Sequence, residues 1–390
     1  MLIPVGINSW AMRSIAQPTN AKRLVVILLR GGIDGLNIVI PHQEANYYQA
    51  RPTIAIPYPQ EKNGAIDLNG FFGLHPALKD LMPWWKRGNL AFINGSGLST
   101  VSRSHFDAQD YVESGTPGIK STSDGWMNRL LGELPQERLT QALNVGKTTA
   151  RILQGKMSVA NLDPGQNSIR PIAIDTPRVN SAFSSLYGGD DALSKAYQAG
   201  NQARSIIMNE LNQEMASASR GAKSADIFVD DAAEVAKLMV GDTKTQLAFM
   251  NVGGWDSHIN EINLLNRFLP PLGEGLATLA QGLESIWSDT VIMVMSEFGR
   301  TVQENGNAGT DHGRGNVIWL LGGAIRGGQI YGQWEGLNES ELEEGRDLPV
   351  TTDFREAIAS ILQQHLSLDR GNLASIFPEY QLQGNLNLLA

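Results

Sequence analysis

Cysteine is absent from the 390 residues of this chain. The absence excludes a disulfide framework, a thiolate metal site and a cysteine nucleophile. The chain also lacks an apolar run of the roughly 18 residues that would span a membrane. It has no strongly basic block of the kind that binds nucleic acid. We therefore predict neither a transmembrane segment nor a nucleic-acid partner.

The rest of the composition is that of an ordinary globular protein, with 42% hydrophobic and 18% charged residues. The length allows one large domain with insertions, or two domains, and is sufficient for a full-sized core. The net charge is −9. Many of the 41 glycines occur in pairs, which predicts many tight turns between strands and loops.

The first 22 residues differ from the remainder. Residues 1–20 contain a single charge, Arg13, and Ser14-Ile15-Ala16 has the small residues of a signal-peptidase site. The usual basic segment and full-length apolar core are missing. We interpret residues 1–22 either as the remnant of a longer export signal or as a disordered terminus. The first interpretation predicts a periplasmic or otherwise exported protein. If Met1 is the true start, the protein is cytoplasmic.

The stretch from Leu24 to Asn37, LVVILLRGGIDGLN, predicts a buried strand followed by a sharp turn. Its first six residues are apolar without a break, which is typical of parallel strands buried on both faces. Gly31 and Gly32 then allow the backbone to turn. Asp34 follows just past the carboxyl end of the strand, where open α/β sheets bind their ligands. Asp34 could equally cap a helix or a turn.

Further apolar runs predict more strands of the same sheet, at 247–252, 291–295 and 317–321. Helical patterns lie between and after these strands, at 229–240, at about 261–287 and at 353–365. The repeated alternation of strand and helix predicts an α/β fold with a doubly wound, mostly parallel sheet.

Residues 115–225 interrupt this pattern. Ser, Thr, Asn, Gln and Ala become common, and short strands predicted at 142–145 and 172–174 alternate with polar helices. Residues 191–220 predict an exposed amphipathic helical segment. We interpret 115–225 as an insertion or cap within a domain spanning 23–390. We expect it to pack above the carboxyl edge of the sheet and to determine the substrate.

Acidic and imidazole side chains stand next to four of the predicted strands. They are Asp34 after the first strand, Asp256 and His258 after 247–252, Glu297 after 291–295, and Asp311 with His312 before 317–321. Since parallel strands bring their carboxyl ends to one edge, these residues should converge. Imidazole and carboxylate ligands suit Zn, Mn or Fe, and also Mg or Ca where oxygens dominate. We therefore predict at least one divalent metal at this edge.

A site of this kind fits the hydrolysis of phosphate or sulfate esters, with a small anionic ester as the substrate. A metal neutralises the anion and stabilises the leaving oxygen, and an arginine can clamp the anion with two hydrogen bonds. The candidates for that arginine are Arg314, Arg103 and Arg300.

Each motif also has a structural explanation. Asp256 and His258 could cap and begin a helix, Glu297 could pair with Arg300, and Asp311-His312 could form a loop network. Ser104 could be the N-cap of a helix that begins near His105. The joint placement of the motifs at strand ends favours the functional interpretation.

Five motifs together resemble a known family. They are RGGIDGLN, SRSHFDAQDYVESG, NVGGWDSH, SEFGRT and GTDHGRGNVIWLLGGAIRGGQIYG. The chain resembles the bacterial family called domain of unknown function 1501 over about residues 23–380. That family is placed, by resemblance, in the alkaline phosphatase and sulfatase superfamily. Its members often carry twin-arginine export signals, which agrees with the short N-terminal segment here.

The resemblance implies roles for individual residues. Asp34 matches the metal ligand after the first strand, Asp256 and His258 resemble the Asp/His pair of one metal site, and His312 resembles the late histidine ligand. Ser296-Glu297 stands where the superfamily has an Asp-His pair, so Glu297 is the expected ligand and Ser296 its orienting donor. Ser104 stands where the nucleophile is expected, with Ser102 and His105 as competitors, and Arg314 is expected to face the anion.

Two functions follow as hypotheses. The first is a metal-dependent hydrolase of phosphate or sulfate esters that uses Zn, Mn, Mg or Ca. The second is a non-catalytic binding or cell-surface-associated protein with a degenerate metal site. Metal content, followed by activity on phosphate, phosphodiester and sulfate esters, separates the two.

Overall fold

A computed structural model describes residues 21–135, 141–146, 148–162, 215, 217–241, 245–384 and 386–390. The export-signal remnant expected at 1–22 lies almost entirely outside these residues. So do the strand expected at 172–174 and most of the helical segment expected at 191–220. Among the described helices, none combines the length and the apolar character that crossing a bilayer requires.

One large sheet organises the chain around β1 (Arg23–Leu29), which pairs in parallel with β9 (Leu247–Gly253) on one side and β10 (Thr290–Ser296) on the other. The strand order is β12-β5-β11-β10-β1-β9-β6-β7. The remaining strands on this path are β5 (Leu90–Gly97), β6 (Ala142–Val145), β7 (Ala160–Leu162), β11 (Asn316–Gly322) and β12 (Gln329–Tyr331). In addition, β13 (Thr352–Asp353) pairs with β5, and β8 (Lys223–Ser224) pairs with β9. The four strands expected at 24–29, 247–252, 291–295 and 317–321 are thus confirmed as members of one sheet.

Among the described strands of this sheet, only β11 runs against the others, because it is antiparallel to both β10 and β5. All other pairs in the sheet are parallel. The reversal brings the amino end of β11 to the edge where β1, β9 and β10 have their carboxyl ends. The loop that enters β11 therefore reaches the same edge as the loops that leave the other three strands.

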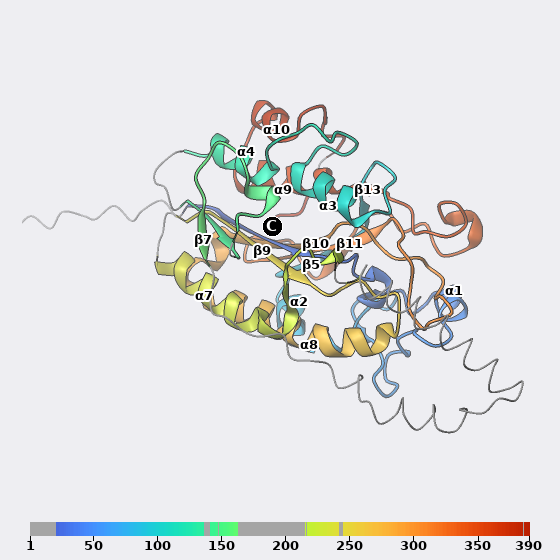
Figure 1. Ribbon diagram of the computed structural model, residues 1–390. Helices are drawn as coiled ribbons and strands as arrows, with labels where there is room; N and C mark the ends of the chain where they lie inside the picture. Colours follow the sequence, from blue (N-terminus) through green and yellow to red (C-terminus); the bar gives the residue numbers. More distant parts are fainter. Residues whose placement is uncertain are drawn as a thin grey trace, which may run out of the picture.

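Helices cover both faces of the sheet (Figure 1), with α7 (Phe228–Gly241) and α8 (Glu261–Gly282) on one face. The other face carries α3 (His105–Ser114), α4 (Trp126–Glu133), α9 (Phe354–His365) and α10 (Arg370–Ile376). Alternate residues of β1 enter the two cores: Val25 and Ile27 pack with the α7–α8 side, and Leu24 and Val26 with the opposite side. The uninterrupted apolar run follows from this double burial, and the doubly wound, mostly parallel fold is confirmed.

The other elements are short. A second sheet contains β2 (Val39–Ile40), β3 (Ile66–Asp67) and β4 (Gly73–Leu74), and the short α-helices are α1 (Ala45–Ala50) and α2 (Met82–Lys86). The 3-10 helices are η1 (Gly35–Asn37), η2 (Pro76–Leu81), η3 (Arg151–Leu153), η4 (Ala225–Ile227), η5 (Glu284–Asp289) and η6 (Glu339–Glu341). The helix expected at about 261–287 ends as α8 at Gly282, and η5 follows it.

The expected cap at 115–225 needs a correction where it is described. Its strands β6 and β7 extend the central sheet beside β9, so these residues do not pack above the edge. Short strands with polar residues, such as ALNV at 142–145, do not reveal from sequence that they pair in parallel with a buried strand. Residues 217–219, in contrast, do lie at the carboxyl edge, because the Ser219 hydroxyl accepts the Gly254 amide just after β9 at 3.0 Å.

Candidate metal centre

The candidate site lies at the carboxyl edge of the sheet, where four segments meet. They are the loop after β9, the loop after β10, the loop before β11 and the start of α3. Gly31, just after β1, allows the loop after β1 to approach the loop after β9 closely. Its φ is +122°, and a Cβ atom there would lie 2.5 Å from the Asp256 nitrogen. A residue with a side chain at position 31 would therefore push the β1 and β9 loops apart.

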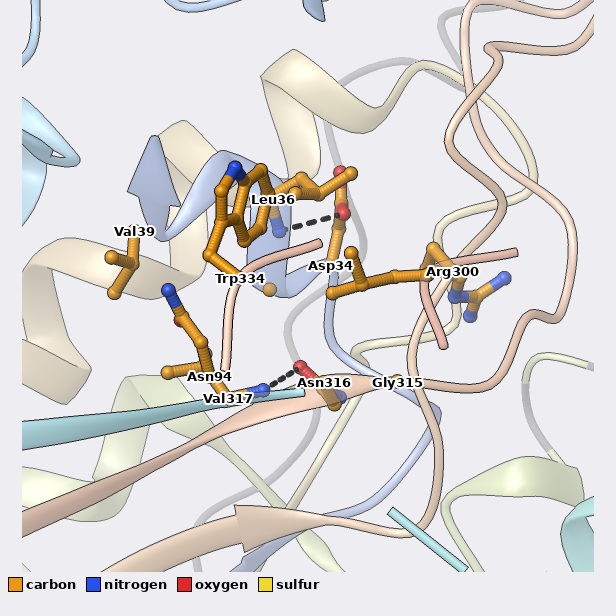
Figure 2. Close-up of a pocket in the computed structure, with 11 residues that line it drawn as sticks. Asp34, Leu36, Val39, Asn94, Arg300, Gly315, Asn316, Val317 and Trp334 are labelled. Carbon is orange, nitrogen blue, oxygen red and sulfur yellow. Dashed lines mark hydrogen bonds between the residues drawn. The ribbon is translucent and has the colours of Figure 1, made fainter. Parts of the chain in front are cut away.

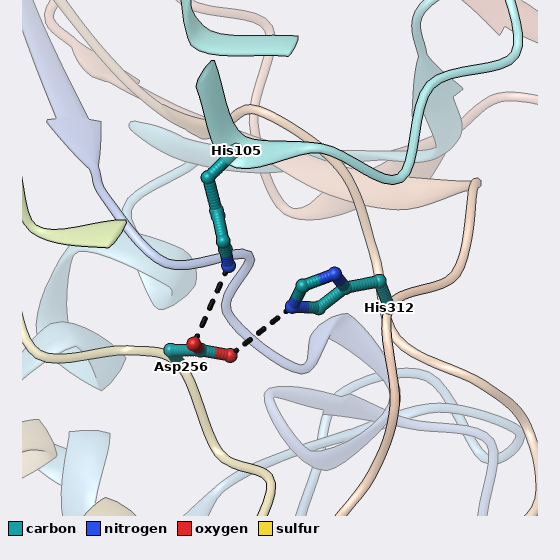
Figure 3. Close-up of side chains that lie close together, drawn as sticks. All are labelled: His105, Asp256 and His312. Carbon is teal, nitrogen blue, oxygen red and sulfur yellow. Dashed lines mark hydrogen bonds and ion pairs between the residues drawn. The ribbon is translucent and has the colours of Figure 1, made fainter. Parts of the chain in front are cut away.

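Three imidazoles surround the carboxylate of Asp256. Figure 3 shows His105 and His312 directed at its two oxygens, each through an Nε2–oxygen distance of 3.4 Å. His258 is the third, with Nε2 3.2 Å from Asp256 Oδ1 and 2.9 Å from His312 Nε2. All four side chains are buried. Residues from two separate loops and one helix thus place four ligand-type side chains around one point.

Each of these imidazoles has an oxygen acceptor at its other ring nitrogen. Nδ1 of His105 lies 2.7 Å from Glu297 Oε1, and Nδ1 of His258 lies 3.1 Å from Asp311 Oδ1. Nδ1 of His312 lies 2.7 Å from the backbone oxygen of Arg103. An acceptor at Nδ1 keeps the hydrogen there and leaves the Nε2 lone pair directed at Asp256. Histidines that bind metals in proteins are held in this way.

The geometry of the donor atoms is suited to a cation. Among the described residues, His105 Nε2 and Asp256 Oδ2 are buried atoms without a hydrogen-bond partner. The Nε2 lone pairs of His258 and His312 would repel each other at 2.9 Å unless a proton or a metal lies between them. Donor atoms of His105, Asp256 and His312 lie within 4.8 Å of one another. Three imidazoles and one carboxylate form a donor set that fits a divalent metal.

In the absence of a cation, protons take its place. Burial disfavours an imidazolium at His105, but Asp256 and Glu297 outweigh it and raise the pKa of His105 to about 9. Burial also lowers the pKa of His312, whereas Asp256 and Asp311 outweigh burial and raise the pKa of His258. The same three histidines and Arg300 hold the pKa of Asp256 far below its ordinary value although burial opposes this.

Glu297 stands behind His105 and not among the converging donor atoms. Its Oε1 accepts the Gly31 amide at 2.8 Å and the Gln109 side chain at 2.8 Å in addition to His105. The Ser296 hydroxyl lies 3.0 Å from Oε2. Burial favours the neutral acid, yet these partners lower the pKa of Glu297 to about 2. The structure thus gives Glu297 the role of orienting His105, in place of the direct ligation expected from sequence.

Asp34 is not brought into the cluster. Its carboxylate pairs with the guanidinium of Arg51, with Arg51 Nη2 3.1 Å from Asp34 Oδ1, and its Oδ1 also caps the Leu36 amide at 3.2 Å. Both side chains are fully buried. Burial would raise the pKa of Asp34, but Arg51 and Glu261 lower it. The expectation that Asp34 is a metal ligand is corrected by this buried ion pair, which already neutralises its charge.

The space next to Asp34 is too small for a substrate. Figure 2 shows the cavity there, lined in part by Asp34, Asn94, Asn316 and Trp334. Its volume is about 10 Å³, which is room for about one water molecule. The substrate must therefore enter elsewhere along the edge.

Glu261 is a buried acid that sequence reasoning missed. It begins α8, accepts hydrogen bonds from Asn37, Ser257 and Thr310 at 2.7 to 3.0 Å, and also bonds Asp34. Burial and the negative charge of Asp34 raise its pKa well above the ordinary value. An acidic residue in the first turn of a helix is common, and for this reason the sequence contained no usable signal.

Arg300 holds the loops of the site together and does not face a substrate. Its side chain is completely buried and donates to Asp256 Oδ1 at 2.5 Å, to the Gly32 oxygen at 2.6 Å and to the Thr310 oxygen at 3.0 Å. These acceptors belong to the loops after β9, after β1 and before β11. Arg300 is therefore unavailable as the anion clamp considered from sequence, and its acidic partner is Asp256 and not Glu297.

The other two predicted catalytic residues, Arg314 and Ser104, differ in their surroundings. Arg314 is buried against Glu343 and donates to the Leu98 oxygen at 3.2 Å, and no described contact joins it to the cluster. Its expected role toward the anion is corrected accordingly. Ser104 is exposed as the N-cap of α3, accepting the Asp107 amide at 3.5 Å, which also bears out the structural explanation of this motif.

An open pocket connects this edge of the sheet with solvent. It has a volume of about 510 Å³ and is lined by Arg103, Ser104, His105, Phe106, Ser217 and Ala218. His105 belongs to both the pocket and the cluster. A small molecule in the pocket would therefore lie beside Ser104 and reach the cluster at His105.

Gln109 is a second residue that sequence reasoning missed. It lies one turn after His105 on α3, is fully buried, and accepts a hydrogen bond from Arg30 at 2.7 Å. Its nitrogen donates both to Glu297 and, at 2.7 Å, to the Ala218 oxygen in the pocket wall. The spacing of four residues from His105 was the available signal, because such residues share one face of a helix.

The family model described as "Protein of unknown function (DUF1501)" matches residues 21–377. No curated protein matches the chain. Among solved structures, similarity is found to the lipoteichoic acid synthase LtaP from Listeria monocytogenes, with 11% identity, 85% of this chain and 74% of that chain covered, and a TM-score of 0.39.

Two further solved structures are similar at the same level. A protein in the alkaline phosphatase superfamily from Vibrio parahaemolyticus has 12% identity, with 80% of this chain and 62% of that chain covered and a TM-score of 0.38. The C-terminal periplasmic domain of EptC from Escherichia coli has 9% identity, with 93% and 88% covered and a TM-score of 0.42. At these identities and TM-scores, none of the three assigns a substrate to this chain.

Proposed function

Because the chain belongs to the DUF1501 family, whose name defines no activity, we propose a function from the residues of the site itself. We propose that the protein is a divalent-metal-dependent hydrolase of phosphate or sulfate esters. Its substrate is a small anionic ester that enters the pocket between Arg103 and Ala218.

One observation carries this proposal. His105, His258 and His312 each direct Nε2 toward Asp256, while an oxygen acceptor lies within hydrogen-bond distance of each Nδ1. In this proposal these four residues hold the metal. Nitrogen donors outnumber oxygen donors, which favours Zn, Mn or Fe over Mg and Ca. A bound metal would supply Lewis-acid stabilisation of the negative charge that develops on the ester.

The residues of the chain supply position and polarity. Glu297 keeps His105 in one orientation, and Arg103 does the same for His312 through its backbone oxygen. Ser104, exposed at the pocket wall, is the proposed nucleophile. Its oxygen attacks phosphorus or sulfur and gives up its proton, the bond to the ester oxygen breaks, and that oxygen takes up a proton and leaves as the alcohol. Water then breaks the bond between Ser104 and phosphorus or sulfur, which releases the acid and restores the serine hydroxyl.

A second function is favoured by the position of Asp34. Because Arg51 and Glu261 engage its carboxylate, Asp34 is not available as a ligand for a second metal. Within the described residues, one group of histidines and acids has the spacing of a metal site. A single, buried metal could serve binding or stability without hydrolysis. This alternative is a non-catalytic binding or cell-surface-associated protein.

We also propose that the protein is exported to the periplasm and acts there. It is supported by the absence of cysteine, which tolerates an oxidising compartment. Cell fractionation of the protein, expressed from its full natural reading frame, tests it. Recovery of the protein only in the cytoplasm would contradict export.

The test of function begins with the metal content of protein purified without chelator. We expect bound Zn, Mn or Fe in the wild type, and loss of it in His312→Ala and Asp256→Asn. His42→Ala is the matched control, because His42 is buried but pairs with Asp67 in the small sheet. Hydrolysis of aryl phosphate, aryl phosphodiester and aryl sulfate should fall by about 100-fold or more in the first two variants only.

The outcomes separate the two functions. Metal together with hydrolysis supports the hydrolase. Metal with no hydrolysis of any of the three esters, even by the wild type, supports the non-catalytic alternative. Full metal content and full activity in both site variants would contradict the assignment of these ligands.

A further inference from the structure

The mouth of the pocket carries an exposed aromatic ring. Phe106, the second residue of α3, is 62% exposed, the highest value among the large apolar residues that the structure describes as exposed. It follows His105 directly, so the same helical turn directs one side chain into the metal cluster and the next to the pocket mouth. Exposing a phenylalanine to water is unfavourable, and a ligand that covers it would gain binding energy.

Ser217 and Ala218 also line the pocket, and their segment is attached to the site. Gln109 holds the Ala218 oxygen at 2.7 Å, and the Ser219 hydroxyl accepts the Gly254 amide at 3.0 Å. Ala218 is a buried apolar residue of the pocket lining. These two hydrogen bonds therefore hold this side of the pocket in place relative to the cluster.

Arg220 follows these lining residues in the chain and contacts Phe106. Its guanidinium lies 5.6 Å from the centre of the Phe106 ring, in a cation–π contact. Its φ of +44° is unusual for a residue with a side chain, and its amide donates to the Ser217 oxygen at 3.0 Å. The local turn thus directs a positive charge to the rim while Phe106 stays largely exposed.

We propose that this pocket is a subsite for an aromatic group, and that the natural substrate is an aryl ester or an ester with a similarly flat apolar group. The inference rests on the proposed function and names the substrate class of that site. The organic group packs between Phe106 and Ala218, the anionic group reaches His105 and the metal ligands, and Arg220 adds attraction at the rim. Small alkyl esters would leave Phe106 exposed and bind less tightly.

The test uses two stable anions that the protein cannot hydrolyse, benzenesulfonate and methanesulfonate. Binding to the full, metal-loaded chain is measured by calorimetry. We expect the wild type to bind benzenesulfonate about 10-fold more tightly, in line with the energies of aromatic pairs. Phe106→Ala should reduce this ratio to about 2-fold or less, and Phe106→Tyr, which keeps the ring, should retain it.

Tyr58→Ala is the matched control, since it removes another exposed aromatic residue, 44% exposed, that does not line the pocket. It should leave the ratio unchanged. Circular dichroism checks that each variant is folded. The ratio of kcat/KM for phenyl and methyl esters should change in parallel with the binding ratio.

The results distinguish this inference from the proposed function. If no ester is hydrolysed but the aryl preference exists and disappears in Phe106→Ala, the subsite is supported and the hydrolase is not. If esters are hydrolysed without an aryl preference, or if Phe106→Ala keeps the preference, the subsite is wrong. Failure of the wild type to bind either anion would also overturn it.

Discussion

The side-chain nitrogen of Gln109 lies 2.8 Å from Oε1 of Glu297. The same nitrogen donates to the Ala218 oxygen, and Arg30, which can only donate, fixes the amide so that its oxygen faces away from Glu297. Gln109 thus connects the carboxylate that orients His105 with the wall of the pocket. It acts through other residues and is a positioning residue.

Replacement of Gln109 by Leu should therefore affect both the metal and the substrate. We expect metal affinity to fall by about 10-fold or more, as for other residues that orient metal ligands, and KM to rise because the wall is released. Both are measured after metal titration of the purified variant. Asn128→Leu is the control, since Asn128 is a buried amide that donates to the Leu153 and Met157 oxygens away from the site. If metal affinity and KM changed equally in Gln109→Leu and Asn128→Leu, the role of Gln109 would be only structural.

Replacing either residue of the Arg51–Asp34 pair should destabilise the folded protein without removing bound metal. Removing one partner of a buried ion pair leaves an uncompensated charge, which costs about 3–5 kcal/mol. Arg51→Met should lower the free energy of unfolding by this amount in urea titrations, and Asp34→Asn by a comparable amount, with bound metal retained in the folded protein. If Asp34→Asn instead lost its metal at unchanged stability, Asp34 would belong among the ligands after all.

Metal binding should become tighter as the pH rises. With the site free of metal, the pKa of His105 is raised to about 9, so at neutral pH its imidazole holds a proton that a metal must displace. The apparent affinity should therefore increase by about 10-fold per pH unit up to about pH 9, with proton release on binding. Titration of metal-free protein at several pH values measures this slope. A pH-independent affinity would mean that His105 does not lose a proton to the metal.

His75 predicts a separate pH dependence of stability. It is buried at the N-cap of η2, where its Nδ1 accepts the Ala77 amide at 3.1 Å, and burial lowers its pKa to about 4. Between its unfolded pKa of about 6.5 and the folded value, the unfolded chain binds a proton that the folded protein does not. The contribution of His75 to the free energy of unfolding is therefore fully present above about pH 6.5 and is lost as the pH falls toward about 4.

The predicted decrease between pH 7 and pH 5 is about 2 kcal/mol. His75→Asn should remove this part of the decrease, because asparagine can still accept at the N-cap but does not titrate. Urea unfolding at both pH values provides the measurement. If the wild type and His75→Asn show the same pH dependence, another group is responsible.

The parts of the fold that could be predicted are those with a strong local cause. β1, β9 and β10 are buried on both faces, and that burial requires the continuous apolar runs seen in the sequence. The direction of β11 could not be predicted in this way, since parallel and antiparallel buried strands have the same composition. Its reversal nevertheless placed His312 at the expected edge.

The candidate site was predictable to the extent that it depends on strand ends. Asp256, His258 and His312 converge as expected, and His105 joins them from α3. The partner of Asp34 was not predictable, because Arg51 comes from an irregular segment with no periodic signal. Whether a buried carboxylate meets a guanidinium or a metal is decided by tertiary packing, and no single motif contains that information.

The position of β1 at the centre of the sheet has a consequence for biosynthesis. Leu24 pairs with Leu247 on one side and with Val291 on the other, so β1 is synthesised long before either of its neighbours. Until then its apolar faces are open to wrong partners, and pairing over such long separations is slow. The nascent chain should therefore depend on a chaperone until β10 has been synthesised.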